Sequence, residues 1–470
     1  MTPSLTQTLA NRARNLSLFD VPMRTRVVAG QIVLDWLGVT LAGASNVSTA
    51  AVSQVMLAQG GTPTATVVGR NVRMSSVSAA LVNGTASHAL DYDDVSFAIP
   101  GHASSPVLAA AFALAETLGS SGEEFLLAVI AGYELSCRVG QLVAPDHYKQ
   151  GFHATATVGC FGATAACGRL LGLDANQMAQ ALGIAATRAA GLKSSFGTSC
   201  KPLQAGNAAS TGVLCALLAQ AGLDAPTDTF EHRIGFASTY SDVKSPQLAL
   251  GVPGLVEDFS LASVAGDRED AFHLDFNLFK YHVACYETHS TIECGQAIRA
   301  MDGFELDNVD SVKLRVNRNA NDICNIQTPR TDTETRFSLR QAATFSLGGL
   351  PTANIETFSL TKANRADLHA LRERVTVELC DEVGIPVTEV EITLKGGRRL
   401  SHRHDSSKPM IDTDAQQVKL QAKFAALASP LIGCDRVEEL ISMTTRLEHL
   451  TKITALAAGL NTSPPHTPVA

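Results

Sequence analysis

The sequence lacks most signatures of common enzyme and binding classes. Aromatic residues make up 5% and charged residues 17% of the 470 residues, and no Lys/Arg run is long enough for broad nucleic-acid binding. The ten cysteines form no CxxC pair, which argues against zinc knuckles and iron–sulfur clusters, and they are expected to be buried thiols. GxSxG, GxxxxGK[ST] and a GxGxxG after a strand are missing too. We therefore expect no metal, no cofactor and no nucleic-acid partner.

Length and charge set further limits. A chain of 470 residues is too long for one ordinary core, so we expect two domains. The net charge of -8 suits an anionic substrate only if the binding pocket is locally basic. The N-terminal segment has no apolar core typical of a secretory signal, which together with unpaired cysteines predicts a cytoplasmic protein. Residues 202–223 are uncharged but interrupted by polar residues, which predicts a buried helix and no membrane span.

Helical periodicity dominates the first 225 residues. It predicts helices over residues 22–42 and 122–143, and a helix that starts just after His102 with Ser105 as N-cap and Pro106 in its first turn. Small residues recur every four positions in residues 159–167, which lets neighbouring helices approach closely. This part of the chain is expected to be all helical.

The pattern changes after about residue 270. Residues 311–317 and 389–394 alternate apolar and polar side chains as half-buried strands do, and Gly396 and Gly397 favour a hairpin turn to a returning strand. Helical periodicity returns in residues 416–432 and 435–460. The fold class is therefore mainly α: a helical domain, 1–269 completed by 406–460, with a smaller α+β domain, 270–405, inserted between its two parts. The proline-rich residues 461–470 are expected to be a disordered tail.

Titratable residues cluster in residues 88–102, HALDYDDVSFAIPGH. Asp91 and its two acidic neighbours need cationic partners, because like charges raise each other's pKa values. Lys201, His153 and Lys280 stand in carbon-rich surroundings and are candidates for that role. Helix capping is the alternative for Asp93 and Asp94, a hydrogen bond to a carbonyl for His153, and a lid-edge position for Lys280.

Several segments together resemble one family. HALDYDDV followed by GH-small-small-P, GFHATATVG, GTSCKPLQAGNAASTG and FKYHVACYETHSTIECG are similar to segments of the MmgE/PrpD family. The resemblance covers about residues 1–460. It implies a helical domain with an inserted lid, a homodimer, and an active site in a cleft between the domains.

The resemblance also implies site residues. It places substrate-site groups at Asp91, His102, His153, Lys201 and Lys280. We expect Asp91, His102, His153 and Lys201 to be catalytic. Lys280, Asp93 and Gln341 are expected to bind substrate. Two positions depart from the cis-aconitate decarboxylase branch, since a threonine is replaced by Val95 and a lid tyrosine by Gln341, which cannot donate a proton as a phenol does. These departures argue against decarboxylation of cis-aconitate itself.

The residues suit chemistry at a carbon next to a carboxylate. Lysine can hold the charge that develops there, and histidine exchanges protons near neutral pH. We expect a cofactor-independent lyase, most simply a 2-methylcitrate dehydratase-like hydro-lyase acting on a small di- or tricarboxylate. The alternatives are an epimerase of the iminodisuccinate type and a non-catalytic carboxylate-binding protein. His282, Cys285 and His289 are expected to pack or hydrogen-bond rather than to bind metal.

Overall fold

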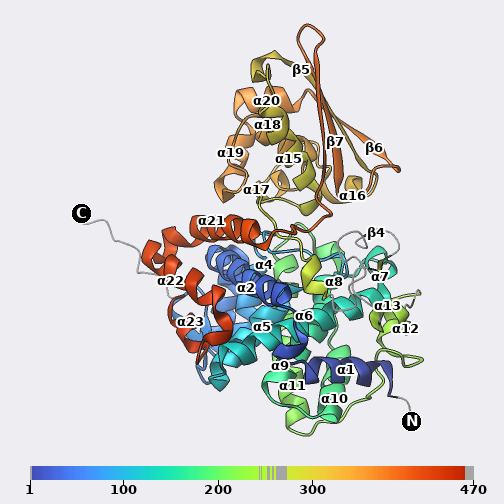
Figure 1. The fold of residues 1–470 in the computed structure, drawn as a ribbon, viewed down its shortest axis with the longest axis vertical. Helices are drawn as coiled ribbons and strands as arrows, with labels where there is room; N and C mark the ends of the chain where they lie inside the picture. The colour runs from blue at the N-terminus through green and yellow to red at the C-terminus, as the bar shows by residue number, and fades with distance from the viewer. Residues whose placement is uncertain are drawn as a thin grey trace. The chain divides into compact units, whose positions relative to one another are not determined.

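A computed structural model describes residues 3–242, 244, 246–250, 255–256, 259–260 and 272–460 (Figure 1). The expected disordered tail, 461–470, and the expected domain boundary at 269/270 lie outside these residues. The chain divides into two compact units. Unit 1 contains Met1–Phe279 and Met410–Ala470, and unit 2 contains Lys280–Pro409. The expected mainly helical fold is confirmed for the described residues, whereas a lid function for unit 2 stays a prediction.

Unit 1 is mainly helical, but the expectation of an all-helical domain is wrong, because its described residues also form two short antiparallel strand pairs, β1 (Ala65–Val67) with β2 (Val72–Met74) and β3 (Leu255–Val256) with β4 (Phe259–Ser260). Its helices are α1 (Leu5–Asn15), α2 (Met23–Gly43), α3 (Val47–Gln59), α4 (Ser76–His88), α5 (Ser104–Leu118), α6 (Gly122–Val143), α7 (Asp146–Lys149), α8 (Ala154–Thr157), α9 (Gly159–Leu170), α10 (Ala175–Ala186), α11 (Cys200–Gln220), α12 (Phe236–Tyr240), α13 (Pro246–Leu250), α21 (Thr413–Ile432), α22 (Cys434–Thr445) and α23 (Thr454–Ala458).

Apolar periodicity predicted α2 and α6 closely. α6 begins after a capping box in which Ser121 and Glu124 satisfy each other's backbone N–H groups. Among the described residues, α2 and α6 are long and apolar enough to cross a membrane, but 83% and 94% of their apolar windows are buried inside the protein. Such burial is typical of the core helices of a folded domain.

Three expectations at the ends of elements are wrong. α5 begins at Ser104, with Ala103 at the N-cap, because the Ser105 hydroxyl is buried against the hydroxyl of Ser87 and is not free to cap. The helical run expected over 435–460 breaks after Thr445, where the backbone of Arg446 leaves the helical region. The cysteines are not all buried, because Cys200 and Cys434 stand at exposed helix starts.

Glycines bring α4 and α11 into close contact. A Cβ added to Gly84 would lie 2.8 Å from the Cα of Gly206, and one added to Gly206 would collide with the carbonyl oxygen of Leu81. The two helix backbones therefore touch where they cross. This crossing fixes the C-terminal end of α4 relative to the first turn of α11, and both ends carry site residues.

Unit 2 is built on a four-stranded sheet with the order β6-β5-β7-β8. β5 pairs parallel with β6 and antiparallel with β7, and β7 pairs antiparallel with β8. The strands are β5 (Val309–Asn317), β6 (Val375–Cys380), β7 (Val387–Leu394) and β8 (Arg399–Asp405), and the helices are α15 (His289–Arg299), α16 (Ala320–Cys324), α17 (Asp332–Thr335), α18 (Leu339–Leu347), α19 (Leu360–Ala363) and α20 (Ala366–Arg372).

One apolar face of this sheet forms the core of unit 2. Val312, Leu314 and Val316 of β5 are buried together with side chains of α15 and α18, as their alternation predicted. Gly396 and Gly397 both have positive φ in the β7–β8 turn, which is the conformation that glycine permits there. The parallel partner of β5 was not predicted.

Candidate active site

The candidate site starts at the turn that follows α4. Asp91 in this turn has a φ of 52°, in the left-handed region that non-glycine residues seldom adopt. Residues held in such a conformation concentrate at functional sites, because the surrounding structure must impose it. The surrounding fold therefore holds the backbone of Asp91 in this conformation.

Lys201 meets this turn from the first turn of α11. Its Nζ lies 2.6 Å from Oδ1 of Asp91, and each of the two side chains is 13% exposed. The pair combines a fixed charge interaction with access to solvent. A small anion can therefore approach the ammonium group.

His102 lies between two carboxylates. Its Nε2 is 3.4 Å from Oδ1 of Asp91, and its Nδ1 is 3.2 Å from Oδ2 of Asp93. The backbone N–H of His102 donates to Oγ1 of Thr155, and its side chain is 10% exposed. Asp91, His102 and Lys201 thus form one partly accessible group.

Asp93 and His88 are buried next to this group. Nδ1 of His88 is 2.9 Å from Oδ2 and 3.1 Å from Oδ1 of Asp93, and both side chains are at most 1% exposed. Burial lowers the pKa of His88 to about 4, so this ring is neutral near pH 7. Burial alone would raise the pKa of Asp93, but His102 and His88 outweigh it and hold that pKa well below its usual range.

His153 approaches from the start of α8. Its Nδ1 is 2.8 Å from Oε1 of Gln204, whose amide nitrogen donates to the carbonyl oxygen of Leu192. These two bonds orient the amide and place the imidazole proton on Nδ1. Burial, and then electrostatic repulsion by His88 and Lys201, hold the pKa of His153 well below its usual range. His153 is therefore a neutral ring.

The ring of Phe196 packs beside both Lys201 and His153. Its ring lies 5.0 Å edge-on from the ring of His153, and Nζ of Lys201 lies 5.2 Å from its centroid. The aromatic face adds an apolar wall and a weak cation–π contact next to Asp91.

A second charged cluster contacts the turn that carries Asp91. Lys423 of α21 lies 2.6 Å from Asp35 of α2 and donates to the carbonyl oxygen of Tyr92 at 2.9 Å. Asp94 accepts from the hydroxyl of Ser104. Burial, and then the charges of Asp35 and Asp93, raise the pKa of Asp94 to about 8. Asp94 is therefore protonated at neutral pH.

Four side chains of the site have the donor types of a metal centre. The ligand atoms of His88, Asp91, Asp93 and His102 all lie within 4.8 Å of one another. Lys201 already places a positive charge on Asp91, and Asp93 already binds Nδ1 of both imidazoles. The carboxylates of Asp91 and Asp93 thus already take part in ion pairs of the protein, and a metal would compete with Lys201 and the two imidazoles for them.

Two expected substrate-binding residues belong to unit 2. Lys280 is 1% exposed. Gln341 is fully buried in α18, and its Oε1 accepts from Arg372 at 2.9 Å. Their contact with substrate stays a prediction. His282 was expected to form hydrogen bonds rather than to bind a metal. Its Nδ1 is hydrogen-bonded to Thr352 at 2.8 Å, and its Nε2 is paired with Glu293 at 3.2 Å.

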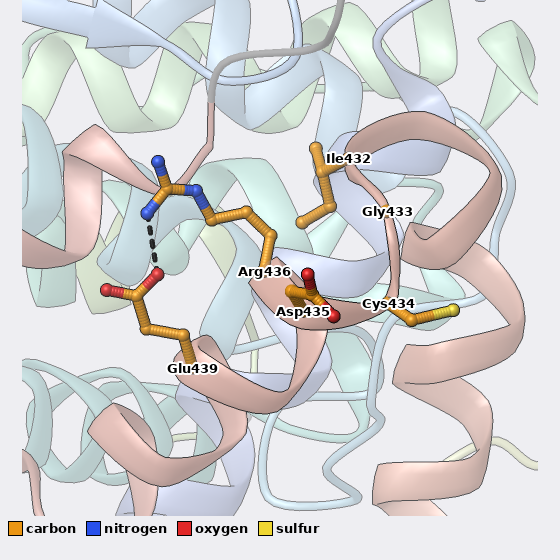
Figure 2. A pocket seen from close by; sticks show the side chains of 6 residues that line it. All are labelled: Ile432, Gly433, Cys434, Asp435, Arg436 and Glu439. Carbon is orange, nitrogen blue, oxygen red and sulfur yellow. Dashed lines mark hydrogen bonds and ion pairs between the residues drawn. The ribbon is translucent and has the colours of Figure 1, made fainter.

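A surface pocket lies elsewhere in unit 1. It is lined by the turn between α21 and α22, and Figure 2 shows Arg436 directed toward Glu439 in it. These two side chains form an ion pair of 2.6 Å. The residues that line this pocket include no histidine, whereas the Lys201–Asp91 pair has His102 beside it.

Within unit 1 the structure brings together Asp91, Asp93, His102, His153 and Lys201, five of the residues expected from the sequence. Sequence reasoning did not single out four further side chains that shape the site: His88, Phe196, Gln204 and Lys423. His88 carried a signal, because it stands in the same HALDYDD segment as Asp91.

Comparison with known proteins gives two family matches and several full-length relatives. Residues 7–249 match the MmgE/PrpD N-terminal domain, and residues 282–449 match the MmgE/PrpD C-terminal domain. Cis-aconitate decarboxylase of Homo sapiens is 29% identical over 482 residues, covering 99% of this chain and 96% of the human protein. The enzyme of Mus musculus is 29% identical over 471 residues, 96% of this chain and 92% of its own.

A fungal relative has the same name. Cis-aconitate decarboxylase of Aspergillus terreus is 25% identical over 482 residues, covering 97% of this chain and 96% of the fungal protein. Decarboxylases are lyases, so these names agree with the enzyme class that the sequence predicts. They name a carbon–carbon lyase, whereas the sequence led us to expect a carbon–oxygen lyase.

Proposed function

The chain belongs to the MmgE/PrpD family, and we propose that it is a lyase that acts on a small tricarboxylate by proton transfer between Asp91, His102 and Lys201. The observation that carries this proposal is the contact of 2.6 Å between the partly exposed Lys201 and Asp91, with His102 on the other side of the same carboxylate. An ammonium group and an imidazole thus face one place that a substrate can reach.

The charges fit a reaction next to a carboxylate. Lys201 binds a substrate carboxylate and stabilises the negative charge that develops on the neighbouring carbon. His102 removes the proton from that carbon, a role that contributes ~10²- to 10⁴-fold to the rate of such reactions. The neutral His153 presents Nε2 as a hydrogen-bond acceptor for a substrate hydroxyl or acid.

For the finer reaction we propose dehydration of the 2-methylcitrate dehydratase type. The carbon–hydrogen bond breaks with transfer of the proton to His102, a carbon–carbon double bond forms, and the hydroxyl on the next carbon departs. Lys201 protonates this hydroxyl, which leaves as water. Asp91 lies between His102 and Lys201, so it can return the proton from the imidazole to the amine. Val95 and Gln341, at positions where decarboxylases are expected to carry a threonine and a tyrosine, favour dehydration over decarboxylation.

Decarboxylation of cis-aconitate is the second candidate, because the full-length relatives carry that name. In that reaction the carbon–carbon bond to a carboxylate breaks, carbon dioxide leaves, and the electron pair left on carbon is protonated. The same acid–base groups serve both reactions.

A substrate panel tests the proposal. Purified protein is incubated with citrate, 2-methylcitrate, cis-aconitate and aspartate-derived acids, and products are followed by ultraviolet absorbance, carbon dioxide release and mass spectrometry. Dehydration gives an unsaturated acid without gas, and decarboxylation gives gas. In D₂O, an epimerase instead gives a deuterated isomer of the substrate. Thermal stabilisation by an acid that is never converted would indicate a binding protein and contradict the lyase proposal.

Lys201→Ala is the decisive variant. We expect kcat/KM to fall by about 10³-fold or more, because the cation that stabilises the developing charge is lost. Lys452→Ala, which removes an exposed lysine of unit 1, is the matched control and should leave the rate unchanged. Equal activity of the two variants would refute the site.

A further inference from the structure

Asp93 occupies a position that substrate cannot reach. It is 1% exposed, whereas Asp91 and Lys201 are each 13% exposed. Its carboxylate is shared by Nδ1 of His88, at 2.9 Å, and Nδ1 of His102, at 3.2 Å. An acid in this position acts on the substrate only through the imidazoles that it holds.

We propose that Asp93 and His88 are positioning residues that fix the tautomer and the orientation of His102, so that its Nε2 faces Asp91 and Lys201. This inference rests on the proposed acid–base role of His102 and adds two residues to it. Asp93 was expected from the sequence to bind substrate, and its burial fits positioning better.

The tautomer follows from hydrogen-bond chemistry. An ionised carboxylate only accepts hydrogen bonds, so Nδ1 of His88, which is bonded to Asp93, must carry a proton. For His102, Nδ1 lies 3.2 Å from Asp93, whereas Nε2 lies 3.4 Å from an oxygen of Asp91 that Lys201 already pairs with at 2.6 Å, so the single proton of the neutral ring belongs on Nδ1. The pKa of Asp93 is held well below its usual range, so the acid is ionised at neutral pH. In its neutral form His102 then has a lone pair on Nε2, the nitrogen on the accessible side.

His88 also supports the imidazoles by packing. Its ring centroid lies 4.6 Å from that of His102, at 68° between planes, and 5.7 Å from that of His153, nearly stacked at 28°. One buried ring therefore orients Asp93 through Nδ1 and contacts both other imidazoles. His88 is neutral near pH 7, so it adds no positive charge beside them.

The charged groups around this array come from several elements. His102 is faced by Asp91 and Asp93 of the turn after α4, by His88 of α4 and by His153 before α8. Lys201 of α11 and Lys423 of α21 act at longer range on His88 and Asp93. In this set only His88 shares the Asp93 carboxylate with His102, which makes His88 the group to vary.

Two substitutions of His88 separate positioning from simple packing. Asn places an N–H donor close to where Nδ1 stands, whereas Leu fills space without a donor. We expect His88→Leu to lower kcat on the order of 10²-fold with little change in KM, as for groups that orient an imidazole. The acid limb of its kcat/KM profile should move to higher pH, because Asp93 then acts on His102 alone. His88→Asn should recover most of the rate and the original limb.

The contrary outcomes are equally defined. A folded His88→Leu protein with the wild-type kcat and pH profile would overturn the proposal. If Asn and Leu variants lost activity equally and both melted at lower temperature, His88 would be a packing residue only, which also overturns it. Circular dichroism and thermal melting establish that each variant is folded.

A spectroscopic measurement is independent of turnover. With ¹⁵N-labelled histidine, two-bond ¹H–¹⁵N spectra of the full chain report which nitrogen of each neutral ring carries the proton, and His102→Gln and His88→Asn assign the signals. We expect Nδ1–H for both rings. An Nε2–H tautomer for His102 would refute the positioning role even in an active enzyme, and the expected tautomers in a protein without lyase activity would refute only the proposed function.

Discussion

Asp93 and Asp94 are neighbours in the sequence, and their surroundings shift their pKa values in opposite directions. Two imidazoles hold the pKa of Asp93 well below its usual range, while burial near Asp35 raises that of Asp94 to about 8. At neutral pH one acid is therefore ionised and the other is protonated within a single turn. The two identical side chains thus differ in protonation state, and the sequence alone does not show this difference.

Asp94 makes stability depend on pH. Its pKa is 3.8 in the unfolded chain and about 8 in the fold, so the folded state binds the extra proton between these values. The stability that this proton contributes is present at low pH and is lost as pH rises toward 8, with a slope of at most ~1.4 kcal/mol per pH unit. We expect Asp94→Asn to become more stable relative to wild type from pH 5 to pH 8.

Urea denaturation of both proteins across this range measures the difference. Comparing the two chains cancels the other buried groups, including Glu134, whose pKa burial raises to about 7. A constant difference between wild type and Asp94→Asn at all pH values would contradict the assigned protonation.

Residue chemistry in the sequence pointed to the groups for which we propose acid–base roles, but not to the side chains that support them. Asp91, His102, His153 and Lys201 were identified by a charged segment in an uncharged setting and by resemblance to a family. Lys423 was missed, because it lies on a helix whose periodicity says only that one face is buried. A partner far along the chain leaves no local pattern.

At the scale of elements, α21 carries a charge into the core of unit 1. Lys423 is paired with Asp35 of α2 and hydrogen-bonded to Tyr92, and its Nζ lies 3.9 Å from the ring centroid of Tyr92. Burial lowers the pKa of Lys423, and Asp35 opposes that shift. The last long helix of the chain therefore helps to hold the turn that carries Asp91.

Lys423→Met should destabilise the protein by about 3–5 kcal/mol, because it leaves the Asp35 carboxylate buried without its cation. Asp35→Asn combined with Lys423→Met removes both charges and should recover much of this loss. Urea midpoints of the wild type and both variants measure the effect. Equal midpoints for the single and double variants would show that the pair does not bear on stability.

Elements with strong periodicity were predicted well, and their ends less well. α6 and the β7–β8 hairpin follow from apolar spacing and glycine placement. The start of α5 was misplaced, because Ser105 pairs with the hydroxyl of Ser87 from α4, a contact outside its own helix. The pairing of β5 with β6 likewise depends on contacts between distant strands.

At the scale of the whole molecule, unit 1 is made from two separate stretches of chain. α21 packs against α2, and Gln416 of α21 donates to Gln31 of α2 at 2.6 Å. Unit 2 is formed by the residues between the two stretches, 280–409. Its action as a lid, the homodimer and the cytoplasmic location stay predictions.

A chain that ends at Pro409 should therefore fail to form a stable unit 1. It lacks α21, so the buried face of α2 and the carboxylate of Asp35 lose their cover. We expect loss of cooperative thermal unfolding by circular dichroism. A chain that ends at Leu460 is the control and should melt like the full protein. Cooperative melting of the shorter chain at the wild-type temperature would contradict this dependence.

The pairing of Asp35 with Lys423 also bears on biosynthesis. A ribosome releases α2 and the Asp91 turn long before it translates α21, and the whole of unit 2 emerges in the interval. Until then the growing polypeptide carries a core carboxylate without its ammonium counterpart, so the turn that carries Asp91 gains its final support only at the close of translation.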